Sequence, residues 1–324
     1  MKAIRIHETG GPEVLRVEEV PDPTPGPGEL LIEVEATGVN FIEIYQREGL
    51  YQVPRPFTPG SEAAGVVSAV GPNVSKFGVG DRVVSQSVKG AYAERAIVPA
   101  EKAVIIPDGV DSMIAAASFL QGLTAHYLTT STYPLKPGDR CLIHAAAGGV
   151  GLLLCQMAKK RGAYVIGTAS TDEKRRLAKA HGADETIDYT TQNFATETRR
   201  LTNGAGVNVV YDSVGKTTFD GSLDSLARRG MLALFGQSSG PVPPVDPQIL
   251  NRKGSLFLTR PTLNDYVATR DELESRATEL LGWVHAHELS VRIGARFSLE
   301  NAGEAHQALT SRKTTGKVLL TAAM

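Results

Sequence analysis

The segment Ala146-Ala147-Gly148-Gly149-Val150-Gly151 decides the fold of this 324-residue chain. It follows an apolar run at residues 140–144, which is typical of a buried strand, and it leads into a helix-like stretch at residues 150–161. Glycines between a strand and a helix are the context of the dinucleotide fingerprint, in which a pyrophosphate meets the free N–H groups of the helix N-terminus. The alternative is a tight turn without a ligand. The flanking elements favour a nucleotide-binding site.

The positions of this segment have different expected roles. Gly148 permits close approach of the backbone to a pyrophosphate, and Gly151 permits the helix to pack tightly against its strand. Gly149 and Val150 stand where the turn passes into the helix, whose N-terminus offers free N–H groups to the phosphates. Ala146 stands where the usual pattern has its first glycine.

The chain beyond this segment alternates between strand-like and helix-like stretches. Such alternation is typical of a parallel doubly wound sheet, because each strand is connected to the next through a helix. The predicted fold class is therefore α/β. The expected strands lie at residues 164–168, 185–189, 207–211, 231–235 and 255–259, and the expected helices lie at residues 172–180, 194–201 and 217–226.

Residues 1 to about 125 have a different pattern, in which short alternating polar and apolar runs are bounded by glycine or proline. Many short strands joined by turns favour a partly open β-barrel. The tail is expected to hold helices at residues 270–287 and 299–311 and a last strand at residues 317–320. Because the barrel partners of this strand would lie near the start of the chain, we expect the two ends to meet, with the nucleotide-binding domain inserted between them.

The end of the second strand of the doubly wound sheet indicates which nucleotide binds. An NAD site usually has Asp or Glu there, whereas residues 167–171 read Gly-Thr-Ala-Ser-Thr and contain no acid. An acid would repel a 2′-phosphate, but Ser170, Lys174 and Tyr189 can bind one. We therefore predict NADPH (NADP+) rather than NADH as the cofactor. The alternative for Lys174 is an exposed charge on a helix.

The composition excludes several classes of protein. The 34 Lys and Arg residues balance 35 Asp and Glu residues, so no net field recruits nucleic acid or anionic lipid. Cys141 and Cys155 are the only cysteines, which excludes a disulfide framework and a Cys-only zinc site. No apolar run reaches the roughly 18 residues of a membrane span, and the N-terminus carries charges where a secretory signal would be apolar. We expect a cytoplasmic protein.

Five motifs carry a resemblance to a known superfamily: Gly38-Val39-Asn40, Pro59-Gly60-Ser61-Glu62-Ala63-Ala64-Gly65, Gly80-Asp81-Arg82-Val83, His144-Ala145 with the glycine segment, and Tyr211-Asp212-Ser213-Val214-Gly215. In this order they resemble the medium-chain dehydrogenase/reductase superfamily, and specifically its zinc-free quinone oxidoreductase (ζ-crystallin-like) branch, over essentially the whole chain. The resemblance implies a GroES-like β-barrel domain at residues 1–124 and 262–324 with an inserted Rossmann domain at residues 125–261. It also implies a cleft between the domains and a homodimer.

The chain departs from the alcohol dehydrogenase branch at the positions that bind catalytic zinc there. The resemblance puts Asn40 and Ser61 where that branch has Cys and His, and Glu62 cannot build a site alone, since a catalytic zinc needs about three protein ligands. Both cysteines fall in the nucleotide-binding domain, where they are expected to be core thiols. We predict that no metal is bound. Without a Lewis acid, a quinone or a conjugated enone fits better as the hydride acceptor than a simple carbonyl.

The resemblance also implies site residues outside the glycine segment. Asn40, Tyr45 and Tyr51 would lie near the nicotinamide and the substrate, although ordinary packing is an alternative role for the two tyrosines. The loop after the fifth strand lies at the carboxyl ends of the strands, where open α/β sheets bind ligands. The further cofactor-binding residues that we expect are Thr124, Ser213, Gly236, Gln237, Ser238, Phe257, Thr259 and Arg312.

The predicted activity is NADPH-dependent reduction of a quinone, with hydride transfer from nicotinamide C4 in the interdomain cleft and no obligatory acid among the site residues. One alternative is reduction of a conjugated C=C bond in an enone or enoyl substrate, with Tyr45 or Tyr51 as the proton donor. An alternative of another class is an NADPH-binding structural protein, as crystallins are, or an RNA-binding protein. The near-neutral charge argues against RNA.

Overall fold

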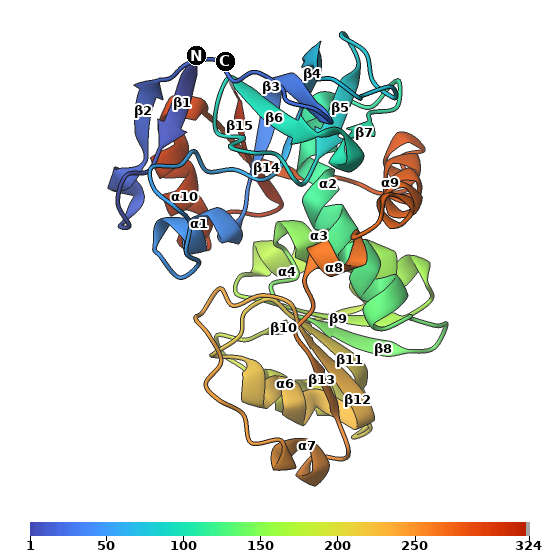
Figure 1. Ribbon diagram of the computed structural model, residues 1–324. Helices are drawn as coiled ribbons and strands as arrows, with labels where there is room; N and C mark the ends of the chain where they lie inside the picture. The colour runs from blue at the N-terminus through green and yellow to red at the C-terminus, as the bar shows by residue number, and fades with distance from the viewer. Residues whose placement is uncertain (322–324) are drawn as a thin grey trace. The chain divides into compact units, whose positions relative to one another are not determined.

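The computed structural model describes residues 1–321 of the chain, which separates into two compact units. The first unit consists of Met1–Gln121 together with the chain from Thr269 onward, and the second unit consists of Gly122–Ala268. In Figure 1 the first unit runs from blue to green and again from orange to red, and the second unit runs from green to orange. The second unit is therefore an insertion in the sequence of the first.

A six-stranded sheet forms the centre of the second unit, with the strand order β10-β9-β8-β11-β12-β13 and parallel pairing throughout. The direction of winding reverses between β8 and β11, which is where doubly wound sheets bind nucleotides. The predicted doubly wound parallel sheet is confirmed. Its strands are β8 (Arg140–Ile143), β9 (Tyr164–Ala169), β10 (Glu185–Asp188), β11 (Val207–Asp212), β12 (Leu226–Leu234) and β13 (Phe257–Thr259).

Helices connect these strands and supply part of the apolar core. Leu142, Ile166 and Val210 of the sheet pack in one buried cluster with Leu223 of a connecting helix. The helix that follows β9 begins where Thr171 accepts a hydrogen bond from the backbone N–H of Lys174, as a good N-cap residue does. The helices of this unit after β8 are α3 (Gly149–Lys160), α4 (Asp172–Ala180), α5 (Phe194–Leu201), α6 (Phe219–Ser225), α7 (Gln248–Arg252) and α8 (Leu263–Tyr266).

A larger sheet forms the centre of the first unit, with the order β14-β15-β3-β4-β5-β7 and with β6 paired to β3. Strands β1 and β2 form a separate two-stranded antiparallel sheet. The strands are β1 (Lys2–Arg5), β2 (Arg16–Glu19), β3 (Glu29–Val39), β4 (Ala63–Val70), β5 (Arg82–Ser85), β6 (Arg95–Pro99), β7 (Val104–Ile105), β14 (Ile293–Ser298) and β15 (Lys317–Thr321).

The last strand, β15, joins the two ends of the chain. It pairs in antiparallel fashion with β3, so that Val318 lies opposite Val39 and Leu320 lies opposite Thr37. Val39, Val318 and Leu320 belong to one buried cluster. The expectation that the two ends of the chain meet is confirmed, and the pairing brings Lys317 to the end of β3.

Three elements of the first 127 residues and of the tail differ from the sequence prediction. The region to about residue 125 was expected to be β-rich, but it also contains helices α1 (Phe41–Arg47) and α2 (Ser112–Tyr127). Most side chains of α2 are themselves buried, so the helix lacks the 3.6-residue apolar period that reveals a surface helix in a sequence. Strand β14 was also missed. The predicted tail helices are present as α9 (Arg270–His285) and α10 (Ala302–Thr310).

Short turns of other helical types complete the described chain: 3-10 turns at Pro12–Val14, Ala100–Lys102 and Leu299–Asn301 and a π-helical segment at Leu128–Thr132. Within residues 1–321, none of the helices combines the length and the apolar character needed to cross a bilayer.

A buried histidine ties α10 to the rest of the first unit. Arg47 Nη1 lies 3.1 Å from His306 Nδ1, and the Tyr92 hydroxyl lies 3.1 Å from His306 Nε2. Because an arginine only donates, Nδ1 accepts and the ring is neutral. Loss of water, together with the nearby guanidinium, lowers the pKa of His306 to about 3.

This histidine is expected to make the protein sensitive to acid. Between about pH 6.5 and 3 the unfolded chain binds a proton at His306 that the folded chain does not, so the free energy of unfolding falls by about 1.4 kcal/mol per pH unit from this group. Denaturant unfolding at pH 7 and pH 5 measures this change in the free energy of unfolding, which should be smaller in the His306→Gln variant than in the wild type. The exposed His285 offers a control, since His285→Gln should leave the slope unchanged; equal slopes for all three proteins would contradict the assignment.

Candidate active site

The turn between β8 and α3 has the backbone shape of a phosphate-binding loop. Ala145 adopts a left-handed φ of 50°, and Gly148 precedes the first residue of α3 with extended backbone angles. The N–H of Ala146 donates to the carbonyl of Thr168 at 3.0 Å, which ties the turn to the end of β9. The first N–H groups of α3 are therefore held at the switch point of the sheet, where an anion can accept from them.

The glycines of this turn are required by close packing. A Cβ on Gly151 would lie 2.3 Å from the Ala145 carbonyl oxygen, so only glycine lets α3 sit this close to the turn. Ala146, at the position of the usual first glycine, is accommodated by the next strand. A Cβ on Gly167 of β9 would lie 2.7 Å from the Ala146 Cβ, so the glycine of β9 makes room for the methyl group.

The residues predicted to bind a 2′-phosphate lie after β9 and β10. Ser170 follows β9, Lys174 lies in the first turn of α4, and Tyr189 follows β10 with an exposed side chain. Partial burial lowers the pKa of Lys174. The neighbouring Arg175 pairs with Asp172 and, at 2.5 Å, with Asp188, so its charge is already balanced within the protein.

The loops after β11 and β12 are tied to each other. The N–H of Ser238 donates to the carbonyl of Ser213 at 3.1 Å, and a Cβ on Gly236 would lie 2.6 Å from the same oxygen. Gln237 lies between these two residues. Phe257 and Thr259 belong to β13, which pairs directly with β12. The structure thus brings the loops after β11 and β12 together at one edge of the sheet, with Thr259 at the end of the neighbouring β13, whereas Phe257 lies at the start of that strand opposite Met231.

A buried polar network, which the sequence analysis did not single out, shapes this edge. Asp212 accepts hydrogen bonds from the N–H groups of Val214 and Gly215 and from the Ser222 hydroxyl, at 2.8, 3.0 and 2.8 Å. His144 lies 3.0 Å from the Ser222 hydroxyl through Nε2. Burial lowers the pKa of His144, so the ring is neutral.

The other nitrogen of His144, Nδ1, lies 3.0 Å from the Thr168 hydroxyl on β9. The ring thus joins the end of β8 to β9 directly and to Asp212 of β11 through Ser222 of α6. Its position two residues before the glycine segment was the available signal in the sequence.

The remaining predicted residues of the nucleotide-binding set are dispersed. Thr124 is buried on α2 within the second unit. Arg312 belongs to the first unit and has a left-handed φ of 57° just after α10. Cys141 and Cys155 are buried in the second unit, and burial raises the pKa of Cys155 to about 12. Both thiols are therefore protonated core residues, as expected.

The first unit gathers Tyr45 and Tyr51 at α1. Their ring centroids lie 5.4 Å apart in an edge-to-face arrangement, and Phe41 stacks obliquely on Tyr45 with a centroid distance of 6.1 Å. The N–H of Tyr51 donates to the Tyr45 carbonyl at 3.1 Å, and the Tyr51 side chain is 39% exposed. Aromatic surface of this kind can pack against a flat ring.

Asn40 precedes α1 and is surrounded by buried charge. Its carboxamide oxygen accepts from Lys317 Nζ at 2.7 Å, and its Nδ2 lies 3.3 Å from Glu62 Oε2. Glu43 accepts from the Asn40 N–H at 2.7 Å and from the Ser61 hydroxyl at 2.9 Å. Burial raises the pKa of Glu43 to about 7 in spite of these hydrogen bonds. Neither Glu43 nor Lys317 was predicted, because only the fold brings them to Asn40.

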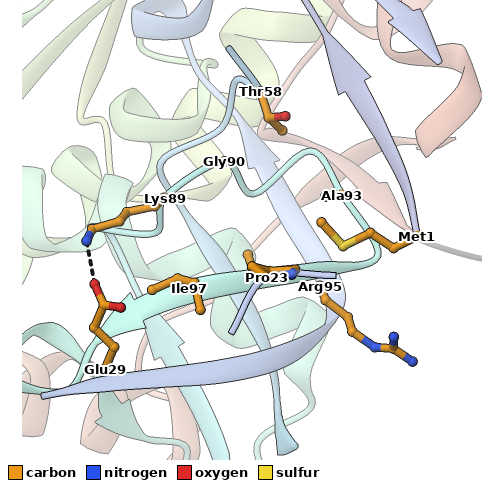
Figure 2. A pocket seen from close by; sticks show the side chains of 10 residues that line it. Met1, Pro23, Glu29, Thr58, Lys89, Gly90, Ala93, Arg95 and Ile97 are labelled. Atoms are coloured by element: carbon orange, nitrogen blue, oxygen red, sulfur yellow. Dashed lines mark hydrogen bonds and ion pairs between the residues drawn. The ribbon is translucent and has the colours of Figure 1, made fainter. Parts of the chain in front are cut away.

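A surface hollow of about 270 Å³ in the first unit lies outside the predicted site (Figure 2). Two of its charged side chains pair with each other, Lys89 Nζ and Glu29 Oε1 at 2.5 Å, while Arg95 pairs with Asp22 outside the hollow. None of the ten residues that line it belongs to the predicted site. Within residues 1–321, no group of three or more His, Cys, Asp or Glu side chains is placed to hold a metal ion.

Comparison with known proteins identifies the family. Two family models match the chain: the alcohol dehydrogenase GroES-like domain at residues 26–108 and the zinc-binding dehydrogenase at residues 149–281. A quinone oxidoreductase of Pseudomonas aeruginosa is 48% identical over 98% of this chain and 99% of its own length. The chain belongs to the zinc-free quinone oxidoreductase branch of the medium-chain dehydrogenase/reductase superfamily.

Solved structures of this family agree with the fold. A mycobacterial protein complexed with NADPH is 53% identical, with a TM-score of 0.97 over 99% of this chain and 100% of that chain. The Escherichia coli quinone oxidoreductase complexed with NADPH is 43% identical, with a TM-score of 0.96 over 99% and 100% of the two chains. The GroES-like and Rossmann architecture predicted from the motifs is confirmed.

Proposed function

We propose that this protein is an oxidoreductase that uses NADPH to reduce a quinone. The observation that carries the proposal is its similarity, over nearly the whole chain, to quinone oxidoreductases, including 48% identity to the Pseudomonas aeruginosa protein. The Escherichia coli relative of known structure is complexed with NADPH. The geometry of the glycine turn and the absence of an acid at residues 167–171 support the same cofactor.

The residues of the second unit fit NADPH. The pyrophosphate would meet the backbone of Gly148, Gly149, Val150 and Gly151. At Gly151 the turn is so tight that a Cβ would collide with the Ala145 carbonyl oxygen. Ser170, Lys174 and Tyr189 would hold the 2′-phosphate, since a cation and two hydroxyl groups suit a dianion. The rest of the cofactor would contact Asn40, Thr124, Ser213, Gly236, Gln237, Ser238, Phe257, Thr259 and Arg312.

The chain's own contribution to the reaction is orientation and exclusion of water. When bound, NADPH supplies the hydride that a quinone accepts. The N-terminus of α3 fixes the phosphates, while Tyr45 and Tyr51 offer aromatic faces and hydroxyl groups to the acceptor. After hydride transfer the reduced quinone needs one proton, which solvent can supply, so no side chain has to act as an obligatory acid.

NADPH consumption with quinones, conjugated enones and aldehydes in parallel tests this function. We expect turnover with quinones and little with simple aldehydes, because residues 1–321 hold no group of His, Cys, Asp or Glu side chains placed to bind a Lewis-acidic metal ion that would polarise a carbonyl. A purified protein that binds NADPH and oxidises it with none of the quinones would overturn the proposal.

Lys174→Ala should lower kcat/KM for NADPH by about 10- to 100-fold, the usual value of a charge-assisted hydrogen bond, and leave the value for NADH nearly unchanged. Lys179→Ala is the matched control, since Lys179 lies on the same helix and pairs with Glu185 at 3.2 Å. Equal losses with both cofactors would remove Lys174 from the 2′-phosphate site.

A second candidate is reduction of a conjugated C=C bond. The observation that favours it is a 2-haloacrylate reductase of Burkholderia, which is 42% identical over 97% of this chain and 97% of its own length. If a tyrosine donates the proton, Tyr45→Phe or Tyr51→Phe should cost about 100-fold or more in turnover of an enone. For quinone reduction we expect each variant to stay within about threefold of wild type.

We also propose that the protein is a cytoplasmic homodimer that does not bind nucleic acid. In this proposal residues 1–124 and 262–324 form the catalytic domain, and residues 125–261 form the NADPH-binding domain. The balance of 34 basic and 35 acidic residues supports the absence of nucleic acid. A purely structural or RNA-binding role would be favoured if the acceptor screen showed no turnover and an RNA-binding assay were positive.

A further inference from the structure

Lys317 lies at the centre of a buried network that links both ends of the chain. Its ammonium lies 2.5 Å from Glu62 Oε2 and 2.7 Å from Asn40 Oδ1, and its side chain is 1% exposed. Glu62 is completely buried, and its second oxygen accepts from the N–H of Leu120 at 2.6 Å. Every polar atom of this ion pair is therefore anchored by hydrogen bonds.

The network determines the orientation of the Asn40 carboxamide. An ammonium group can only donate, so the amide oxygen must face Lys317. The amide nitrogen lies 3.3 Å from both the Gly38 carbonyl and Glu62 Oε2, which are acceptors for its two hydrogens. Both hydrogens of the amide nitrogen are thus engaged, and Oδ1 faces Lys317 and, in the capping box of α1, the backbone N–H of Glu43. The amide nitrogen therefore has no hydrogen left to donate to a ligand.

The backbone of β3 is shaped to fit the ion pair. A Cβ on Gly38 would lie 1.9 Å from Glu62 Oε2 and 2.6 Å from Lys317 Nζ, so the pair lies directly against the strand. A buried ion pair contributes little net stability compared with apolar side chains of the same volume, because desolvation offsets the attraction. Stability of the fold therefore does not explain why a lysine occupies this position. The orientation of the Asn40 carboxamide does explain it, because Lys317 donates to its oxygen.

We propose that Lys317 is a positioning residue, which holds the Asn40 carboxamide in one orientation at the start of α1, the helix that carries Tyr45. This inference rests on the proposed function, in which Asn40 and Tyr45 lie near the reacting groups. Glu62 acts with Lys317 by neutralising its charge and by accepting from Asn40.

A double-mutant cycle tests the role of Lys317. The variant Lys317→Met/Glu62→Gln removes both charges together, so it should unfold at a midpoint close to that of the wild type. Its kcat/KM for a quinone such as 1,4-benzoquinone, at saturating NADPH, should fall about 10-fold or more. In an Asn40→Ala background the same two changes should cost less than about threefold, since the amide that they orient is already absent. The loss should appear in kcat/KM and not in the midpoint of unfolding.

The inference is overturned if Lys317→Met/Glu62→Gln keeps the wild-type kcat/KM, or if the loss is equally large in the Asn40→Ala background. If the wild type reduces no quinone, the proposed function fails instead. The fluorescence emission of bound NADPH is then compared among the wild type, Lys317→Met/Glu62→Gln, Asn40→Ala and the combined variant. A spectral change that Lys317→Met/Glu62→Gln causes only when Asn40 is present supports the positioning role. Identical spectra for all four proteins overturn it.

Discussion

Replacing Gly38 with alanine is expected to destabilise the first unit by about 3 kcal/mol or more, the cost of breaking a buried ion pair. The new Cβ would lie 1.9 Å from Glu62 Oε2 and 2.6 Å from Lys317 Nζ. These atoms end flexible side chains, but both side chains are buried, and the N–H of Leu120 holds Glu62 at 2.6 Å. The methyl group therefore has to separate the pair or displace β3. Urea unfolding followed by circular dichroism measures the loss.

Gly78→Ala provides the control for this substitution. Gly78 lies in the same unit, and a Cβ there would have no atom within 4 Å. Its free energy of unfolding should change by less than about 0.5 kcal/mol. If Gly38→Ala proved as stable as Gly78→Ala, the ion pair would not occupy the place that we assign to it.

Gly151→Ala is expected to weaken NADPH binding by about 100-fold and to lower stability by about 1–3 kcal/mol. The Cβ would lie 2.3 Å from the Ala145 carbonyl oxygen and 2.8 Å from Ala146 Cα, and both atoms belong to the backbone. Backbone cannot rotate aside as a side chain can, so α3 has to move away from the turn. Its N–H groups then move from the position in which they meet the phosphates. A fluorescence titration with NADPH and a urea unfolding curve measure the two effects.

Gly148→Ala separates binding from packing. A Cβ on Gly148 would have a single neighbour within 4 Å, the Ala145 carbonyl oxygen at 3.2 Å. Stability should therefore change by less than about 1 kcal/mol, while the methyl group would stand between the backbone and the pyrophosphate. We expect NADPH binding to weaken in this variant as well. Wild-type affinity for NADPH in Gly148→Ala would show that the turn does not hold the phosphates.

The order of elements in the second unit could be predicted from the sequence because its strands and helices have clear and different periods. The glycine segment also marked the turn at the switch point, since glycine is needed where backbone meets backbone. The accommodation of Ala146 could not be predicted. It depends on Gly167, which lies on the neighbouring strand and 21 positions later in the chain.

The sequence was less informative where burial hides periodicity. Most side chains of helix α2 are buried, including three consecutive alanines and Phe119, so the helix has no polar face that would mark it in the sequence. In the same way, Asn40 was predicted as a site residue from a local motif, but its partners were not. Lys317 stands 277 positions away, at the start of the predicted last strand, and nothing in the local sequence marks its side chain as buried.

The sequence by itself determined the α/β class, the glycine turn, NADPH as the cofactor and the family, because each of these follows from short motifs that can be recognised one by one along the chain. Only the tertiary structure decided which side chains complete the site. The pairing of β15 with β3 brings Lys317 to Asn40 and Glu62, and burial then forces each polar atom of the three to find a partner. The orientation of Asn40 is thus a property of contacts between distant segments, which the sequence pattern does not contain.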